Sequence, residues 1–382
     1  MKKTVLFVLV LCLSFAVFGP AFAETAAAEV PGAESPAAEM TADELYQAGL
    51  DAFHAEDYGK ALEYYQLAAD AGNAEAWRSI GYLYENGLDV EQSYDKALEY
   101  YQLAADQGDA KAWMNIGTMY ANGIGVERDY GKTLECYQKA ADLGFADAMF
   151  YLGFIWQAGL SGEPDYGKAL EYYQQAADQG VDAAQYHLAV LYQLGQGVEQ
   201  DYDLAFRYYS LAAEQGYPEA MTAVGYFYGQ GLGTEQNMDE MLKYYNQAAE
   251  LGEPMAQFNL GCCYRDGMGI EQDYEQMLKY FRLAVDQGNA NAQFNLGFAY
   301  YAGQGADPNY GEAFRLFQLA ADQGFPVAMF AVGDCYYLGN GVEKDLKAAA
   351  EWYQKSLDAG YEPDETDQAH LKEVLGEDSL NP

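Results

Sequence analysis

The chain is poor in basic residues and in histidine. It has 20 Lys and Arg against 59 Asp and Glu, and only three histidines, His54, His187 and His370, among 382 residues. A surface this acidic repels phosphate backbones and anionic lipid, which excludes nucleic acid as a partner. The histidines lie far apart in sequence and no His-Glu-x-x-His is present, so we expect neither a metal site nor a cofactor.

Long apolar runs are also missing, with one exception at the start. The stretch from Thr4 to Gly19 is apolar and follows Lys2 and Lys3, and a small-x-small site ends at Ala23. This arrangement predicts a secretory signal peptide over residues 1–23, cleaved after Ala23. The run is too short for a comfortable membrane span, so we expect a periplasmic or secreted protein with no membrane insertion after cleavage. Without the two lysines, 18 basic residues face 59 acidic ones, a net charge of −41.

What the chain does contain is a repeat. The string DYGKALEYYQ at residues 57–66 recurs unchanged at 165–174, an offset of three times 36 residues. Two glycine series keep this 36-residue frame without a break: Gly87, Gly123, Gly159, Gly195, Gly231, Gly267, Gly303, Gly339, and Gly108, Gly144, Gly180, Gly216, Gly252, Gly288, Gly324, Gly360. Eight repeats therefore fill residues 74–361 without insertion or deletion, and residues 41–73 form a shorter ninth unit.

Each repeat is predicted to be a pair of helices. In residues 74–86 Ala76, Ile80 and Leu83 share one face at helical spacing, and Gly87 ends the helix. The second helix begins after a capping residue: Ser93, Asp129, Asp165, Asp201, Asn237, Asp273, Asn309 or Asp345. Alternation of period two is absent, so we expect no strands. One helical pair cannot bury its own apolar face, whereas stacked copies can, which predicts an all-α solenoid.

One position of the first helix is aromatic in all eight repeats, and we expect its rings to fill the core between neighbouring units. Its occupants are Tyr84, Tyr120, Trp156, Tyr192, Tyr228, Tyr264, Tyr300 and Tyr336.

The motifs Ala-x-x-x-Leu-Gly-x-x-Tyr, Gly-x-Gly-Val and Asp-Tyr-x-Lys-Ala-x-x-Tyr-Tyr-x-x-Ala-Ala-x-x-Gly resemble the Sel1-like repeat, a relative of the tetratricopeptide repeat. The resemblance covers residues 42–361, and the first unit, 41–73, is more similar to a plain tetratricopeptide repeat. It implies a right-handed superhelical solenoid whose first helices line a concave face. Members of this family are chiefly protein-binding adaptors, many of them in bacterial envelopes.

The two ends differ from the repeats. Residues 24–40 are rich in Ala, Glu and Pro, and we expect a disordered leader there. Residues 362–382 are predicted to form a capping helix, beginning DETDQAHLKEVL at residue 364, followed by a tail.

If the tetratricopeptide analogy holds, the positions equivalent to 78, 79, 82 and 85 face the concave groove. These positions carry few charges and are rich in aromatic rings and amides, which suit the side chains and backbone of an extended peptide. The alternative is that some of the phenylalanines are buried between adjacent first helices. The predicted partner-binding residues are Asn115, Phe150, Tyr186, Phe258, Asn259, Phe294, Asn295, Tyr301, Phe330 and Tyr337.

The four cysteines outside the predicted signal peptide do not suggest disulfides. Cys262 and Cys263 are neighbours on one helix, Cys335 lies two repeats away from Cys263, and Cys136 replaces a tyrosine of a second helix. We expect all four to be small buried hydrophobic residues.

Three functions are compatible with the sequence. The first is a monomeric, non-enzymatic adaptor that binds a protein or peptide along the groove. The second is binding or hydrolysis of β-lactams or peptidoglycan fragments, as suggested for cysteine-rich family members, whose regular cysteine pair this chain lacks. Ser93 and Lys96 fit Ser-x-x-Lys, but Ser93 occupies a capping position and no partner motif is present. The third is a scaffold whose acidic outer surface holds basic proteins.

Overall fold

The computed structural model describes residues 40–376, and the following account concerns that part of the chain. The predicted signal peptide, all but the last residue of the predicted leader, and residues 377–382 lie outside the described residues.

The described residues form nineteen α-helices and no strand. The helices are α1 (Ala42–His54), α2 (Tyr58–Asp70), α3 (Ala74–Asn86), α4 (Tyr94–Asp106), α5 (Ala110–Asn122), α6 (Tyr130–Asp142), α7 (Ala146–Ala158), α8 (Tyr166–Asp178), α9 (Asp182–Leu194), α10 (Tyr202–Glu214), α11 (Pro218–Gln230), α12 (Met238–Glu250), α13 (Pro254–Asp266), α14 (Tyr274–Asp286), α15 (Ala290–Ala302), α16 (Tyr310–Asp322), α17 (Pro326–Leu338), α18 (Leu346–Asp358) and α19 (Glu365–Leu375).

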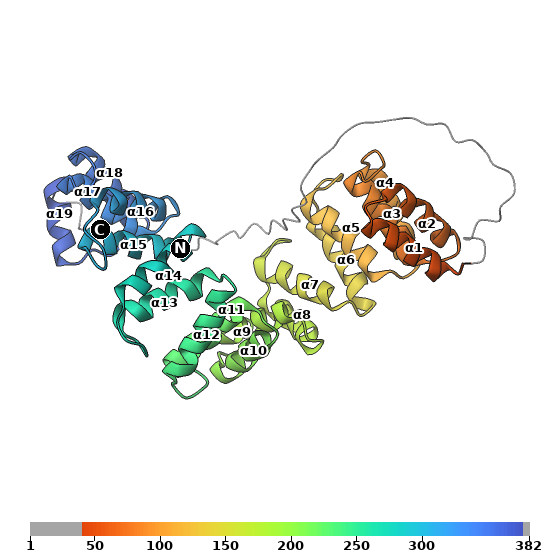
Figure 1. Ribbon diagram of the computed structural model, residues 1–382, viewed down its shortest axis with the longest axis horizontal. Coiled ribbons are helices and arrows are strands. Elements are labelled where there is room, and N and C mark those ends of the chain that lie inside the picture. Colours follow the sequence, from red (N-terminus) through yellow and green to blue (C-terminus); the bar gives the residue numbers. More distant parts are fainter. Residues whose placement is uncertain (1–39, 377–382) are drawn as a thin grey trace.

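The helices are arranged as a chain of stacked pairs. Each odd-numbered helix up to α17 packs on the helix that follows it, each pair packs on the next, and α19 packs on α18. The pairs follow a curved path, with the first pairs and the last pairs at the two ends of an arc (Figure 1). The expected all-α, right-handed superhelical solenoid is confirmed.

The helix ends are formed by the residues that the repeat pattern singled out. All eight predicted capping side chains accept a backbone N–H of the first turn of their helix; for Asp165 the donor is Lys168, at 3.0 Å. Gly87 ends α3 with φ of +66°, a left-handed conformation that costs glycine little. These caps fix the length of each helix and hence the spacing of the pairs.

The principal buried ring of each pair comes from the second helix and not from the predicted first-helix series. Tyr101 of α4 is fully buried and lies over Gly81 of α3 so closely that a Cβ there would sit 2.6 Å from the ring. The glycine is therefore needed for the approach of the two helices. Tyr84 is only half-buried and stacks with Tyr100, with ring centroids 5.4 Å apart. Tyr84 still packs against the core clusters of two neighbouring units, so the series contributes to the core between units without supplying its most buried ring.

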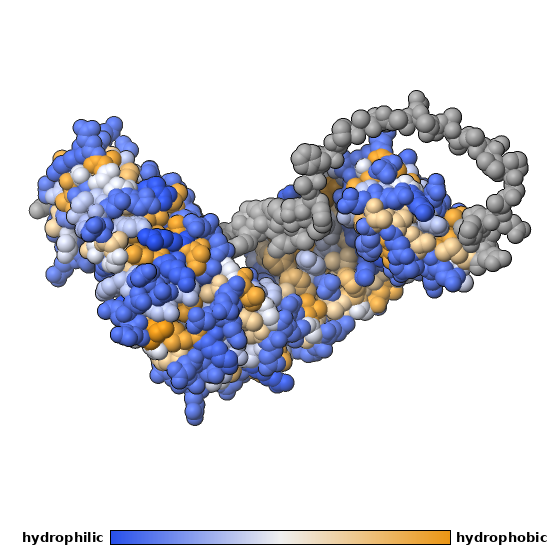
Figure 2. Space-filling view, viewed as in Figure 1, coloured by the Kyte–Doolittle hydropathy of each residue, from blue (hydrophilic) through white to orange (hydrophobic). Residues whose placement is uncertain are grey.

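Apolar residues also reach the surface. Figure 2 shows hydrophobic patches on both arms of the arc, each bordered by hydrophilic residues. None of the helices within residues 40–376 is both long enough and apolar enough to span a membrane. The four cysteines in this part of the chain are free thiols, three of them buried, and burial raises the pKa of Cys136 to about 11.

Candidate functional site

The candidate site is the first-helix wall, which we define as the side chains at the positions equivalent to 78, 79, 82 and 85 in α3, α5, α7, α9, α11, α13, α15 and α17. All ten predicted binding residues belong to it. Nine of them are half-buried, whereas Phe330 is buried, with 3% of its surface exposed. Phe330 packs on Tyr353 and Tyr361, so for this residue the alternative of a core position is the one that the structure supports.

The structure brings three of the ten residues together at one cavity. Phe294 and Tyr301 of α15 and Phe330 of α17 line a hollow of about 190 Å³ between the two helices. The other residues that line it are Phe298, Phe317, Val327, Ala331 and Asp334. The cavity is therefore bounded by five aromatic rings and a single charged group.

The rings of this cavity hold one another in place. The centroids of Phe294 and Phe317 are 5.6 Å apart, and Tyr301 lies edge-on to Tyr310 at 5.2 Å while its hydroxyl accepts the amide of Asn340 at 2.8 Å. Phe298 has no such enclosure, because 49% of its surface is exposed. An apolar hollow whose rings hold one another in place, with one solvent-exposed ring, is suited to receive a side chain from another molecule.

Asp334 supplies the charge. Its Oδ1 accepts the hydroxyl of Tyr353 at 2.6 Å and faces Nδ1 of His370, on α19, at 2.9 Å. Burial raises the pKa of Asp334, and the contacts to Tyr353 and His370 oppose that rise.

The predicted amides do not all remain available to a peptide. Asn295 accepts Nη1 of Arg265 at 2.6 Å and donates to the carbonyl of Asn291 at 2.8 Å, so both ends of its amide are engaged within the chain. The amide of Asn259 forms no hydrogen bond with any described residue. The amide of Asn259 is therefore open to a partner and that of Asn295 is not, and the predicted role of both residues stays a prediction.

The remaining predicted residues are spread along the wall. Phe258 stacks on Phe281 at 5.8 Å, and the Tyr337 hydroxyl donates to Glu373 of α19. Asn115 lies on α5, several pairs from the cavity.

Phe150 of α7 and Tyr186 of α9 enclose His187 in the middle of the wall. Their ring centroids lie 5.6 and 5.5 Å from the imidazole, and Tyr173 stacks on it at 5.3 Å. His187 Nδ1 is 3.2 Å from Oε1 of Gln157. Burial among these rings lowers the pKa of His187 to about 4, so the imidazole is neutral at physiological pH.

The polarity of the wall follows from the buried ring behind it. In five pairs this ring is a tyrosine whose hydroxyl bonds to a polar wall residue: Tyr101 to Glu85, Tyr137 to Thr118, Tyr173 to Gln157, Tyr209 to Gln193 and Tyr353 to Asp334. In α14 and α16 the ring is Phe281 or Phe317, which has no hydroxyl to satisfy. The wall in front of these two rings is therefore free to be apolar.

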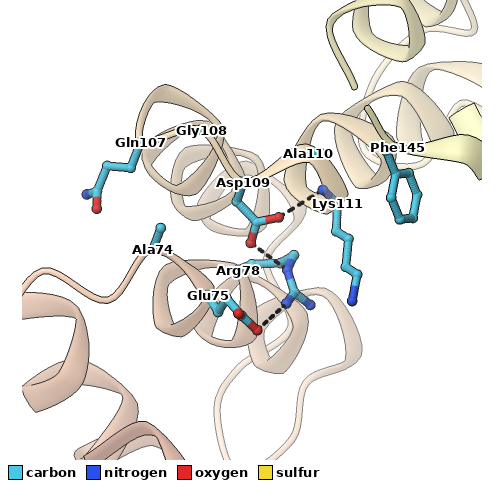
Figure 3. Close-up of a pocket in the computed structure, with 9 residues that line it drawn as sticks. All are labelled: Ala74, Glu75, Arg78, Gln107, Gly108, Asp109, Ala110, Lys111 and Phe145. Carbon is cyan, nitrogen blue, oxygen red and sulfur yellow. Dashed lines mark hydrogen bonds and ion pairs between the residues drawn. The ribbon is translucent and has the colours of Figure 1, made fainter. Parts of the chain in front are cut away.

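A second hollow, of about 320 Å³, lies at the start of α3 and α5 and includes Arg78, Glu75, Asp109 and Lys111 (Figure 3). Arg78 Nε donates to Asp109 at 2.7 Å, and its Nη2 lies 3.3 Å from Glu75. Two carboxylates thus neutralise this guanidinium within the chain. The ammonium of Lys111, in contrast, forms no ion pair with any described residue.

The Ser-x-x-Lys pair is engaged in structural contacts. The Ser93 hydroxyl accepts the backbone N–H of Lys96 at 3.4 Å, and the Lys96 ammonium lies over the ring of Tyr84, 4.8 Å from its centroid. The lysine amine is thus directed to a ring and not to the serine hydroxyl.

Sequence reasoning did not single out two residues of the cavity, Phe298 and Asp334. Both occupy the position equivalent to 82, which the repeat frame already assigned to the wall. The signal was present in that column, because Asp334 is its only acidic member. The other members are Tyr82, Thr118, Phe154, Val190, Tyr226, Cys262 and Phe298.

The sequence model of the Sel1 repeat matches nine consecutive segments: residues 35–73, 75–109, 110–145, 146–181, 182–217, 218–253, 254–289, 290–325 and 326–361. The chain belongs to the Sel1 repeat family. These segments include the unit that we had compared with a plain tetratricopeptide repeat. Sel1 and tetratricopeptide-like repeats generally mediate protein–protein interactions, and the Sel1 solenoid is generally non-catalytic.

Two solved structures are similar to this member of the Sel1 family. A Sel1 repeat protein from Oxalobacter formigenes is 32% identical, with a TM-score of 0.63, and the match covers 76% of this chain and 86% of that protein. The protein c5321 of uropathogenic Escherichia coli, described as a protective antigen, is 28% identical, with a TM-score of 0.57 and coverage of 88% and 83%. No curated protein is a significant match.

Proposed function

We propose that this Sel1 repeat protein is a non-enzymatic interaction scaffold of the cell envelope or the extracellular space. It binds an extended segment of a partner protein along the first-helix wall of α13, α15 and α17. The observation that carries the proposal is the aromatic cavity between α15 and α17, where three of the ten residues chosen from sequence converge.

The chemistry of this stretch suits a peptide. Phe258, Phe294 and Phe298 present ring surface at successive pairs, and burying exposed aromatic surface is a main source of affinity at protein interfaces. The free amide of Asn259 can pair with a peptide backbone. The spacing of the rings is set by the stacking of the pairs, so the wall needs little reorganisation to bind.

Affinity capture from an envelope extract of the source organism tests the proposal. The immobilised chain should retain a partner that is lost on Phe298→Ala and kept on Tyr226→Ala. Tyr226 is the matched control because it occupies the same position of α11 and has 45% of its surface exposed, close to the 49% of Phe298.

Two results would count against the proposal. Equal capture by the two variants would show that the cavity edge is not the site. Capture that vanishes when the salt is raised to about 300 mM, where charges are screened beyond a few ångströms, would favour the acidic outer surface instead.

A further inference from the structure

We propose that the cavity between α15 and α17 binds an arginine side chain of the partner segment, with the stem against the rings and the guanidinium at Asp334. This inference rests on the proposed function and specifies which residue the partner must supply.

One carboxylate oxygen of Asp334 has no hydrogen-bond partner within the described chain. Both of its contacts, to the hydroxyl of Tyr353 and to His370 Nδ1, are made by Oδ1. The second oxygen, Oδ2, takes part in no hydrogen bond within the described chain, although the residue lines the cavity. A carboxylate fixed by one oxygen and open at the other is an acceptor for a donor that enters the cavity.

Within the described chain Asp334 makes one ion pair, between Oδ1 and His370 Nδ1 at 2.9 Å, which is charged only when the imidazole is protonated. All the lining residues belong to the described part of the chain, and none of them is Lys or Arg. Lys344, which follows α17, lies over the Tyr337 ring instead, 5.1 Å from its centroid. Oδ2 itself therefore has no cationic partner within the described chain.

The cavity is lined by five aromatic rings. Aromatic faces attract cations, and a guanidinium is planar and weakly hydrated, so it stacks on rings more readily than an ammonium does. Phe298, at the open edge, can cover the methylene stem of an arginine. A purely apolar side chain would fill the same space but would leave Oδ2 desolvated and unpaired, which opposes its binding.

The buried tyrosine behind the wall does not need a charge at this position. In the second full repeat Thr118 occupies the position equivalent to Asp334, and its hydroxyl alone pairs with Tyr137 at 3.0 Å. A neutral residue can therefore satisfy the buried tyrosine behind the wall. The carboxylate of Asp334 exceeds that requirement by one acceptor, Oδ2, and Asp334 lines the cavity.

The probes for the test are three capped tripeptides with Arg, citrulline or Lys between two glycines. Citrulline has the shape of arginine without its charge. Binding to the full chain is followed through the methyl NMR signals of Val327, which lines the cavity, at about 150 mM salt. Long-range attraction to the acidic surface is then largely screened. We expect the arginine peptide to bind at least about tenfold more tightly than the citrulline peptide, since charge-assisted hydrogen bonds are about twice as strong as neutral ones. Lysine should fall between them.

Asp334→Asn should abolish the difference between the arginine and citrulline peptides, because Asn retains an acceptor for Tyr353 but loses the charge. The matched control is His370→Gln, which removes the α19 contact and leaves the carboxylate, so the difference should persist. Tyr226→Ala should also preserve it.

Equal binding of the arginine and citrulline peptides would overturn the inference, as would a difference that survives in Asp334→Asn. Neither result bears on the proposed function, which is tested separately by comparing partner capture by Phe298→Ala and Tyr226→Ala.

Discussion

The first-helix wall differs between the middle of the solenoid and its C-terminal part. In the middle, the wall faces tyrosines such as Tyr173 and Tyr209, whose hydroxyls bond to Gln157 and Gln193. Towards the C-terminus it faces Phe281 and Phe317, and the residues in front include Cys262 and Phe298. The same backbone therefore carries polar residues bonded to the buried rings in one region. In the other it carries an apolar, hollow stretch that lies between the Arg265–Asn295 and Asp334–Tyr353 contacts.

This contrast indicates how a repeat protein can form an apolar cavity without changing its frame. Loss of a single hydroxyl on the second helix removes the need for a polar partner on the first helix. The wall position is then free to carry a ring, and neighbouring rings can form a cavity. Specialisation of this kind needs no insertion, and none is present between residues 74 and 361.

The largest expected effect removes the feature that both regions share, the buried ring of the second helix. Tyr173→Ala and Phe317→Ala should each lower the free energy of unfolding by about 3–5 kcal/mol, because both leave a large cavity in a close-packed core. Urea unfolding followed by circular dichroism measures this, with the exposed Tyr226→Ala as the control. A loss below about 1 kcal/mol at either site would show that these rings are not the core.

The next effect exchanges the two regions. Phe317→Tyr places a hydroxyl behind Phe298, which offers no acceptor at the position where Thr118 pairs with Tyr137, and should cost about 1–3 kcal/mol. Adding Phe298→Thr should recover part of this loss, because it copies the pairing of Thr118 with Tyr137. A double-mutant cycle in urea measures the coupling, and a coupling of zero would mean that the hydroxyl and the wall residue are independent.

A pH titration should distinguish the middle of the wall from the rest. His187 has a pKa of about 4 in the folded chain against 6.5 as the unperturbed value, so the unfolded chain binds more protons between these values. Its contribution is complete above pH 6.5 and is lost as the pH falls towards 4. Allowing for its partial exposure, we expect roughly 1–2 kcal/mol.

The measurement is the difference between the wild type and His187→Phe in urea unfolding at about pH 7 and pH 4.5, since the many carboxylates contribute equally to both chains. Phenylalanine suits the surrounding rings, and the oxygen of Gln157 still accepts the hydroxyl of Tyr173. An unchanged difference across this range would contradict a neutral, buried imidazole.

The smallest expected effect on stability concerns the exposed wall residues. Phe298→Ala and Tyr226→Ala should each change the free energy of unfolding by no more than about 0.5 kcal/mol, because roughly half of each side chain is already in water. Differential scanning calorimetry checks this. A large loss for Phe298→Ala alone would mean that its ring is part of the core, and its effect on partner capture would then need another explanation.

Much of the fold could be predicted from sequence because residues with the same structural role recur at the same position in eight repeats. The residue before each second helix is needed to cap the helix, and Gly87 is needed for a left-handed helix end. Both were found in the predicted place. The sequence did not identify which aromatic ring lies between the two helices of a pair. Positions 84 and 101 are both aromatic throughout, and only the close approach of Tyr101 to Gly81 shows which ring lies between the helices.

The candidate site was less predictable because it depends on contacts between pairs. Period alone placed Phe294 and Phe330 in one column, and both line the cavity, but Phe330 is buried against Tyr353 and Tyr361 near the capping helix, whereas Phe294 is half-buried. The engagement of Asn295 by Arg265, thirty residues earlier, is likewise invisible in the column that it shares with Asn259.

Site-specific photo-crosslinking tests most directly whether the C-terminal part of the wall binds a partner. A benzophenone amino acid replaces Phe298 on α15 or, as the control, Leu283 on α14, which is similarly exposed at 41%. The wall account predicts one discrete adduct with an envelope protein from position 298, lost on Asp334→Asn if an arginine anchors the segment, and none from position 283. Adducts from position 283 with none from position 298 would contradict it.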